Sequence, residues 1–143
     1  MRTSKNRQIN TEEGENLASE RGDLLKFRWG TLSLKEIRAL LDAIPLDINL
    51  IDRHDVILYY NESGGKIFNR NEKVIGNKVQ LCHPEAVRPK VTEVLDDFRQ
   101  GRRDISETRG EINGRPTRWR YIALRDPQDG YIGAACIVDH LDA

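Results

Sequence analysis

The most reactive side chains of this sequence stand next to each other at Cys82 and His83, directly before Pro84. An imidazole and a thiolate are both axial ligands of haem iron in proteins. The structural alternative is that His83 caps the end of a helix and that Cys82 packs as a small hydrophobic residue. We favour the structural interpretation, and haem ligation by His83 or Cys82 stays open beside it.

The three histidines do not form a metal-binding set. His54, His83 and His140 are far apart in the sequence, and no pair of them has the spacing of zinc ligands. The sequence also shows no recognisable combination of a nucleophile, a base and a group that stabilises charge. We therefore expect neither a metal site nor an enzyme.

Two aromatic residues in the last third of the chain, Trp119 and Tyr121, alternate with Arg118 and Arg120. Successive side chains of a strand point to opposite faces, so the two rings share one face of a predicted strand. We expect this face, together with Ala123, to meet the helices. Aromatic rings fill packed cores as readily as they line binding cavities, and both interpretations stay open.

A helix with clear end signals precedes these residues. Ser33 is followed three positions later by Glu36, which is the pattern of a capping box. Apolar residues then recur every three or four positions up to Ile44, which indicates one apolar helix face. Pro45 ends the helix because the residue before a proline is displaced from the α region.

The N-terminal region has a different character from the rest. Residues 1–20 carry almost no apolar pattern and predict a disordered or loosely held arm. Residues 24–29 predict one short strand that Gly30 ends. We divide the chain into this arm, a flanking segment with a helix over 21–45, and a domain over 46–143.

Five further strands are predicted over residues 48–51, 56–60, 104–112, 117–125 and 131–138. A short polar turn connects the first two strands, and Asn113-Gly114, a strong hairpin signal, connects the third and fourth. The last strand is apolar on both faces, which favours a central position in the sheet. Hairpin connections make neighbouring strands antiparallel, so the pattern predicts an α+β domain with helices on one face of a five-stranded sheet.

A longer helix is predicted over 87–98, after a segment that is irregular or in short helical turns. Gly101 is a good C-terminal stop. The start has two solutions. Either the helix begins at Pro84 and is kinked at Pro89, or it begins near Pro89.

Composition narrows the functional class. The 143 residues hold 23 Lys and Arg against 23 Asp and Glu, and this zero net charge argues against a nucleic-acid binder. No apolar run approaches the length of a membrane span, and none resembles a secretory signal. We therefore expect a cytoplasmic protein with no nucleic-acid or membrane partner. Two cysteines are too few for a disulfide framework.

The order of elements and several segments resemble a PAS domain. The resemblance rests on GTLSLKEI, IPLDINLIDRHDVILYYNE, VIGNKVQLCHP, VLDDFRQGRRD and RYIALRDPQDGYIGAACIVDH. It covers the chain from about Leu24 to the C-terminus. Within PAS domains, the chain is most similar to the C-terminal PAS module of uncharacterised bacterial hemerythrin-linked proteins. This chain has no room for their hemerythrin-like domain, so we expect the PAS module alone.

The resemblance implies a bacterial, non-enzymatic sensory or regulatory domain that works in signal transduction. It implies a small, largely apolar ligand between the sheet and the helices, although fold alone does not determine function. The cavity residues predicted on this basis are Phe68, Val79, His83, Val91, Trp119 and Tyr121.

Two alternatives share the same fold. In the first, the interior is packed without a ligand, and the domain is an interaction module. In the second, haem binds through His83 or Cys82 for redox or gas sensing, although haem-based oxygen-sensing PAS domains carry their ligand His within the longer helix, where this chain has none. The cofactor is otherwise unknown. The segment from Leu24 to Ile44 is a candidate surface for a homodimer or for a signalling partner, as helices beside the sheet are in other PAS domains.

Overall fold

The computed structural model describes residues 21–62, 67–68 and 71–142. The predicted arm over 1–20 lies outside these residues. The chain divides into two compact units between Leu41 and Asp42, a few residues before the boundary predicted at 45. Each unit is described by itself.

The N-terminal unit contains a hairpin where the sequence predicts a single strand. Strand β1 (Leu24–Phe27) pairs antiparallel with β2 (Gly30–Ser33), and the chain turns at Arg28 and Trp29. The prediction that Gly30 ends a strand is wrong. Gly30 has a φ of 100° and starts the second strand, because glycine tolerates the left-handed backbone that this tight turn requires.

The predicted capping box is present at the start of helix α2 (Leu34–Ala43). The Glu36 amide donates to Ser33 Oγ over 3.1 Å, and the Ser33 amide donates to Glu36 Oε1 over 2.8 Å. Arg21 adds a two-pronged contact, with Nε 2.8 Å and Nη2 2.6 Å from the Glu36 carboxylate. The hydrogen bonds from Arg21 and then from the Ser33 amide lower the pKa of Glu36 to about 2.

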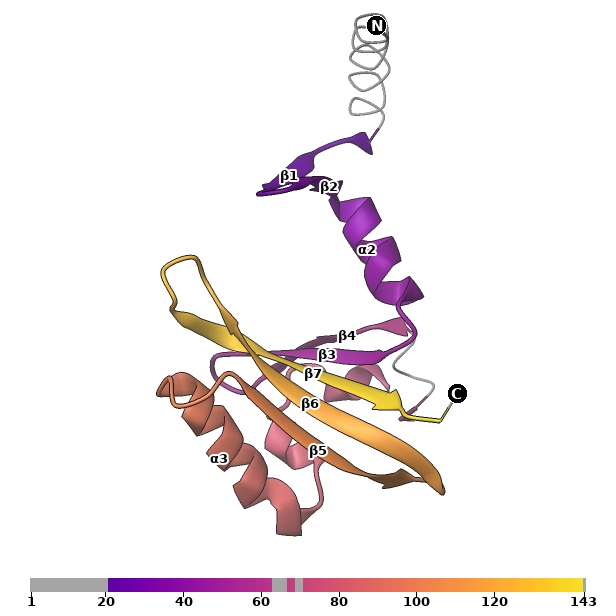
Figure 1. Ribbon diagram of the computed structural model, residues 1–143, viewed down its shortest axis with the longest axis vertical. Helices are drawn as coiled ribbons and strands as arrows, with labels where there is room; N and C mark the ends of the chain where they lie inside the picture. The colour runs from indigo at the N-terminus through magenta and orange to yellow at the C-terminus, as the bar shows by residue number, and fades with distance from the viewer. Residues whose placement is uncertain (1–20, 63–66, 69–70, 143) are drawn as a thin grey trace, which may run out of the picture. The chain divides into compact units, whose positions relative to one another are not determined.

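The second unit is built on a five-stranded antiparallel sheet, as predicted. Its strands are β3 (Asp47–Asp52), β4 (Ile57–Tyr60), β5 (Ile105–Ile112), β6 (Arg115–Arg125) and β7 (Tyr131–His140). Figure 1 shows their spatial order, β4-β3-β7-β6-β5. The strand that is apolar on both faces, β7, lies at the centre, which confirms the sequence prediction. Asn113 and Gly114 connect β5 to β6 with φ values of 51° and 76°, as a type I′ turn requires.

Three short helices and one longer helix pack against one face of this sheet (Figure 1). They are the 3₁₀ helices η2 (Glu72–Val74), η3 (Val79–Cys82) and η4 (Glu85–Val87), and α3 (Arg88–Arg99). Pro89 lies in the first turn of α3, where its missing amide hydrogen removes no helical bond. The second of the two predicted helix starts is therefore the correct one.

Helix α3 ends in a Schellman motif at Gly101. The Gly101 amide donates to the Phe98 carbonyl, the Arg102 amide donates to the Asp97 carbonyl, and Gly101 has a φ of 70°. This cap places the buried side chains of Leu95 and Phe98 against the sheet.

The packed core lies between the sheet and the helices. Its buried members are Ile51, Ile57, Val79, Val91, Val94, Leu95, Phe98 and Ala134. From α3, the C-terminal part contributes the fully buried Leu95 and Phe98. The packing is therefore tightest near the end of the sheet where β3 turns into β4.

At that end, Asp55 connects three elements. Its carboxylate accepts from Arg99 Nη1 over 2.8 Å and from Gln80 Nε2 over 2.9 Å, and its carbonyl accepts from the Val79 amide over 2.9 Å. The Asp55 side chain is 10% exposed, and its contact raises the pKa of the Arg99 guanidinium. The turn between β3 and β4 is thus bound to both η3 and α3.

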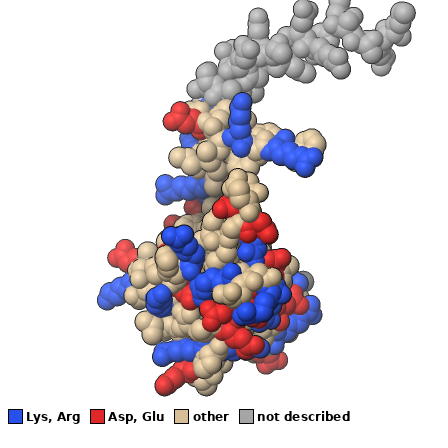
Figure 2. Space-filling view, turned by 90° about the vertical axis from the view of Figure 1, so that its left-hand side faces the viewer, with Lys and Arg blue, Asp and Glu red and all other residues tan. Residues whose placement is uncertain are grey.

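Charged side chains of both signs are interspersed over the face of the domain that Figure 2 presents. Several form ion pairs between neighbouring strands or at helix ends, such as Arg118 with Asp139 and Arg102 with Asp97. Pairs of this kind on a surface add little stability.

We expect the Glu36 carboxyl to titrate near pH 2. Because the folded pKa lies below the usual value of 4.5, the cap contributes stability above about pH 4.5 and loses it as the pH falls through about 2. NMR titration of the Glu36 side-chain carbon measures this. In Arg21→Gln the midpoint should move up towards 4.5, and an unchanged midpoint would contradict the contact with Arg21.

Gly133→Ala should destabilise the domain severely. A Cβ at Gly133 would lie 2.1 Å from the backbone oxygen of Ile51, and the φ of 152° is one that side chains rarely allow. We expect a loss of about 3 kcal/mol or more in urea unfolding. The matched control, Gly101→Ala, also has positive φ but meets no atom within 4 Å, and should lose only about 1 kcal/mol. Similar losses in both variants would contradict the steric argument.

Asp55→Asn should lower the free energy of unfolding by about 2 kcal/mol, because it removes the less exposed of the two carboxylates that pair with Arg99. Asp96→Asn is the control. Asp96 pairs with the same Arg99 over 2.9 Å, but its side chain is 52% exposed, so we expect a loss below about 1 kcal/mol. Chemical denaturation compares the two, and equal losses would show that Asp55 has no special role.

Candidate functional site

A cavity of about 820 Å³ lies between the inner face of the sheet and the helices. Its walls come from all five strands of the sheet on one side and from η2, η3, η4, α3 and the segments between them on the other. The apolar wall includes Val74, Leu81, Val87, Val94, Ile112 and Val138. The volume falls within the range of small-molecule binding sites.

Small side chains on the sheet leave room for this cavity. Cys136 and Ala134 are the inner-face residues at the middle of β7, opposite Tyr121 and Ala123 of β6. On β5, Gly110 makes space for the indole of Trp119, because a Cβ there would lie 3.3 Å from the ring. The inner face of the sheet is therefore hollow at this point, and the side chains of the facing helices are only of medium size.

The structure brings all six predicted site residues to this one cavity. They are Phe68, Val79, His83, Val91, Trp119 and Tyr121. Trp119 and Tyr121 come from β6, Val79 from η3 and Val91 from α3. Val79 and Val91 also belong to the packed core, so they lie where core and cavity meet. Binding of a ligand by these residues stays a prediction.

His83 and Tyr121 form a hydrogen bond beside the cavity. His83 Nδ1 lies 2.9 Å from the Val79 carbonyl, and His83 Nε2 lies 3.1 Å from the Tyr121 hydroxyl. A carbonyl only accepts, so Nδ1 carries the hydrogen, and in the neutral ring Nε2 accepts from Tyr121. The ring thus caps η3 and connects it to β6.

This arrangement fits haem ligation poorly. Both ring nitrogens of His83 are engaged, so an iron at Nε2 would have to displace the Tyr121 hydroxyl. Cys82 lines the cavity and is exposed, so the expectation that it packs as a buried hydrophobic residue is wrong. The buried cysteine is Cys136. Its place in the cavity wall results from strand pairing, which the local sequence does not reveal.

Sequence reasoning missed several polar residues of the wall. Asn49 of β3, Ser106 and Thr108 of β5, and Lys90 of α3 all line the cavity. Asn49 is 7% exposed, and its Oδ1 has no hydrogen-bond partner among the described residues. The feature of the sequence that could have indicated Asn49 is its place inside an otherwise apolar strand, between Ile48 and Leu50.

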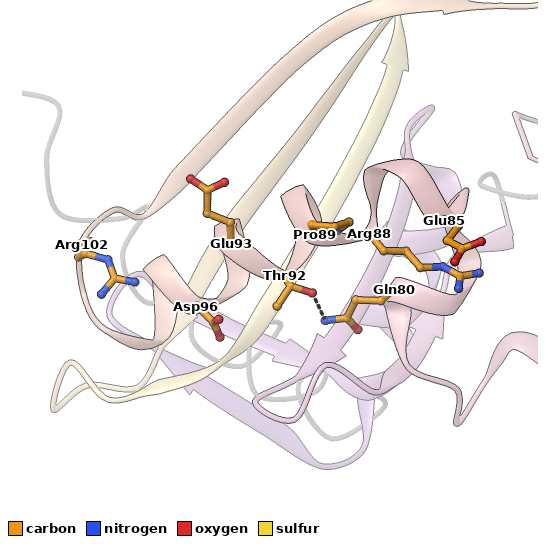
Figure 3. Close-up of a pocket in the computed structure, with 8 residues that line it drawn as sticks. All are labelled: Gln80, Glu85, Arg88, Pro89, Thr92, Glu93, Asp96 and Arg102. Atoms are coloured by element: carbon orange, nitrogen blue, oxygen red, sulfur yellow. Dashed lines mark hydrogen bonds between the residues drawn. The ribbon is translucent and has the colours of Figure 1, made fainter.

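A second depression, of about 720 Å³, lies on the exposed side of α3 (Figure 3). Its lining residues are Gln80, Glu85, Arg88, Pro89, Thr92, Glu93, Asp96 and Arg102. Acidic and basic groups alternate there, and Gln80 is held by hydrogen bonds to Thr92 and Asp55. This surface is more open and more highly charged than the first cavity, whose wall is largely apolar and which we take as the candidate site.

No three His, Cys, Asp or Glu side chains of the described residues lie close enough together to hold a metal ion. No described helix combines the length and apolar character of a membrane span.

Several solved structures have the same fold. A C-terminal domain from Streptococcus mutans is 29% identical with a TM-score of 0.76, and the match covers 85% of this chain and 95% of that one. The PAS domain of Bordetella pertussis BvgS is 18% identical with a TM-score of 0.61, over 77% of this chain and 87% of that one. A sensory box sensor histidine kinase from Vibrio cholerae is 12% identical with a TM-score of 0.56, over 95% and 98%. No curated protein matches the chain.

These comparisons do not test the resemblance to hemerythrin-linked proteins, which stays a prediction. The assignment to a family rests instead on a family model. The family model described as PAS domain matches residues 37–141, which is most of the chain and all five strands of the sheet. The chain therefore belongs to the PAS domain family.

Proposed function

We propose that this PAS domain is a non-enzymatic sensory module of the bacterial cytoplasm that binds a small, largely apolar molecule in the cavity between sheet and helices. The observation that supports this most directly is the cavity itself. A domain that served only as a packed interaction module would gain stability by filling about 820 Å³ with side chains. Retaining a partly open space with a largely apolar wall is the property expected of a ligand site.

The position of the cavity suggests how binding is transmitted. The C-terminal part of α3 is held by Leu95, Phe98 and the contact of Arg99 with Asp55. The earlier part of the helix, from Lys90 to Val94, lines the cavity, although Val91 and Val94 also belong to the packed core. A ligand that contacts this part and β6 together shifts the population of helix positions relative to the sheet.

A packed interaction module or a homodimer is the second candidate. Within the N-terminal unit, Phe27, Trp29 and Leu34 are 52%, 85% and 69% exposed. Exposed apolar groups of this size are typical of association surfaces. Sedimentation of the full chain distinguishes a monomer from a dimer, and a dimer is compatible with ligand binding as well as with an interaction role.

We expect the purified protein to retain a small molecule, detected by native mass spectrometry as mass above that of the polypeptide. An absorbance spectrum of the same sample separates the haem alternative, since a Soret band would require haem. A colourless protein that carries no added mass would contradict a tightly bound ligand of either kind.

Two matched variants, Val87→Trp and Leu58→Trp, test whether the retained molecule lies in the cavity. Both residues are exposed aliphatic side chains, at 44% and 56%, but only Val87 lines the cavity. An indole at 87 competes for the ligand volume, and we expect retention to fall about tenfold, equivalent to about 1.4 kcal/mol. Leu58→Trp should retain the ligand. Equal retention in both would place the ligand elsewhere.

A further inference from the structure

The lining of the cavity carries one sign of charge. Among the described residues that line it, Lys90 is the only one with a full charge at neutral pH, and none is Asp, Glu or Arg. The chain as a whole has 23 acidic and 23 basic residues, so this selection differs from the mixed surface around it. A cavity with a cation and no anion favours an anionic ligand.

Lys90 is placed to serve such a ligand. It lies in the first turn of α3, where the helix dipole adds positive potential. Its side chain is 69% exposed and forms an ion pair with Glu93, which lies 3.7 Å away and is 60% exposed. A solvated pair of this kind is weak and easily exchanged. The ammonium is therefore available to a ligand carboxylate at the cavity mouth.

The interior adds neutral polar contacts. Asn49 is more than nine-tenths buried in the cavity wall, and its Oδ1 lacks a hydrogen-bond partner among the described residues. A buried amide oxygen in this state is costly unless something donates to it. Ser106 and Thr108 offer hydroxyls on the same wall. The cavity thus fits a molecule with some polar groups along an apolar body.

Other charge classes fit less well. A cationic ligand would lie near Lys90, which repels it, and near no carboxylate of the lining. The free energy that a cation loses on leaving water would therefore not be recovered in the cavity. A phosphate or a dianion is typically held by several charge-assisted donors, often arginines, whereas this lining contains Lys90 and no arginine. A single lysine at the mouth of an apolar cavity matches a single negative charge.

We propose that the ligand of this domain is an amphipathic monocarboxylate, with its carboxylate at Lys90 and its apolar body against Trp119, Val91 and Val138. This inference rests on the proposed function, because it assigns a chemical class to the same cavity. It goes beyond that function by predicting which charge the ligand carries and which residue selects it.

The test uses three probes with the same eight-carbon body: octanoate, 1-octanol and octylamine. The chain has two tryptophans, so Trp29→Phe leaves Trp119, in the cavity wall, as the reporter of binding by fluorescence. In this background we compare Lys90→Glu with Lys73→Glu. Lys73 is an exposed lysine of η2 that does not line the cavity, so the control makes the same charge change elsewhere.

In the Trp29→Phe protein, we expect octanoate to bind and octylamine to bind more weakly than 1-octanol. In Lys90→Glu, the Kd of octanoate should rise about tenfold, since reversal removes one favourable contact and adds an unfavourable one of about 0.7 kcal/mol each. The Kd of 1-octanol should not change, and octylamine should gain affinity. Lys73→Glu should change none of the three.

The outcomes separate the two claims. If octanoate and 1-octanol both bind but Lys90→Glu affects them equally, the carboxylate assignment is wrong and the ligand cavity stands. The assignment is also wrong if octylamine binds most tightly. If no probe changes the fluorescence of Trp119 and native mass spectrometry detects no bound molecule, the proposed function fails together with the inference.

Discussion

The contact between Asp55 and Arg99 is the constraint on which the arrangement of sheet and helices depends. Asp55 lies in the turn between β3 and β4 with a φ of 67°, and its carboxylate is bonded by side chains from both η3 and α3. The two layers are packed beside this contact through Leu95 and Phe98. The cavity lies next to that core and shares with it Ile57, Val79, Val91 and Val94.

A hollow of this size lowers stability, because its lining atoms lack the dispersion contacts of a packed core. The sequence shows how it is maintained. Where the centre of the sheet is opposite the cavity, β7 has Cys136, and where Trp119 needs space, β5 has Gly110. Larger residues at these positions would fill the space or displace the indole. At Cys136, packing alone would favour a larger side chain, whereas Gly110 is explained by the space that the indole of Trp119 needs.

Much of the fold could be predicted from the sequence, because its signals are local. The capping box at Ser33, the hairpin at Asn113-Gly114 and the apolar character of β7 each act within a few residues. The N-terminal hairpin was missed because a single glycine at the end of an apolar run is ambiguous between a stop and a tight turn. The polar part of the cavity wall could not be found, since Asn49 meets Cys136 through strand pairing across more than half of the chain.

The hydrogen bond between His83 and Tyr121 is non-local in the same way, since the two residues lie 38 positions apart in the sequence. It also gives His83, of the Cys82-His83-Pro84 segment, a structural contact. In the neutral ring, Nδ1 binds the Val79 carbonyl and Nε2 accepts from the Tyr121 hydroxyl, so His83 joins a short helix to the sheet. The cavity lies beside this joint on one side and beside the N-terminal half of α3 on the other, where Thr92 accepts from Gln80 and Arg88 donates to the His83 carbonyl. Under the proposed function, occupancy would be transmitted through these contacts, relative to the end of the domain that Asp55 holds.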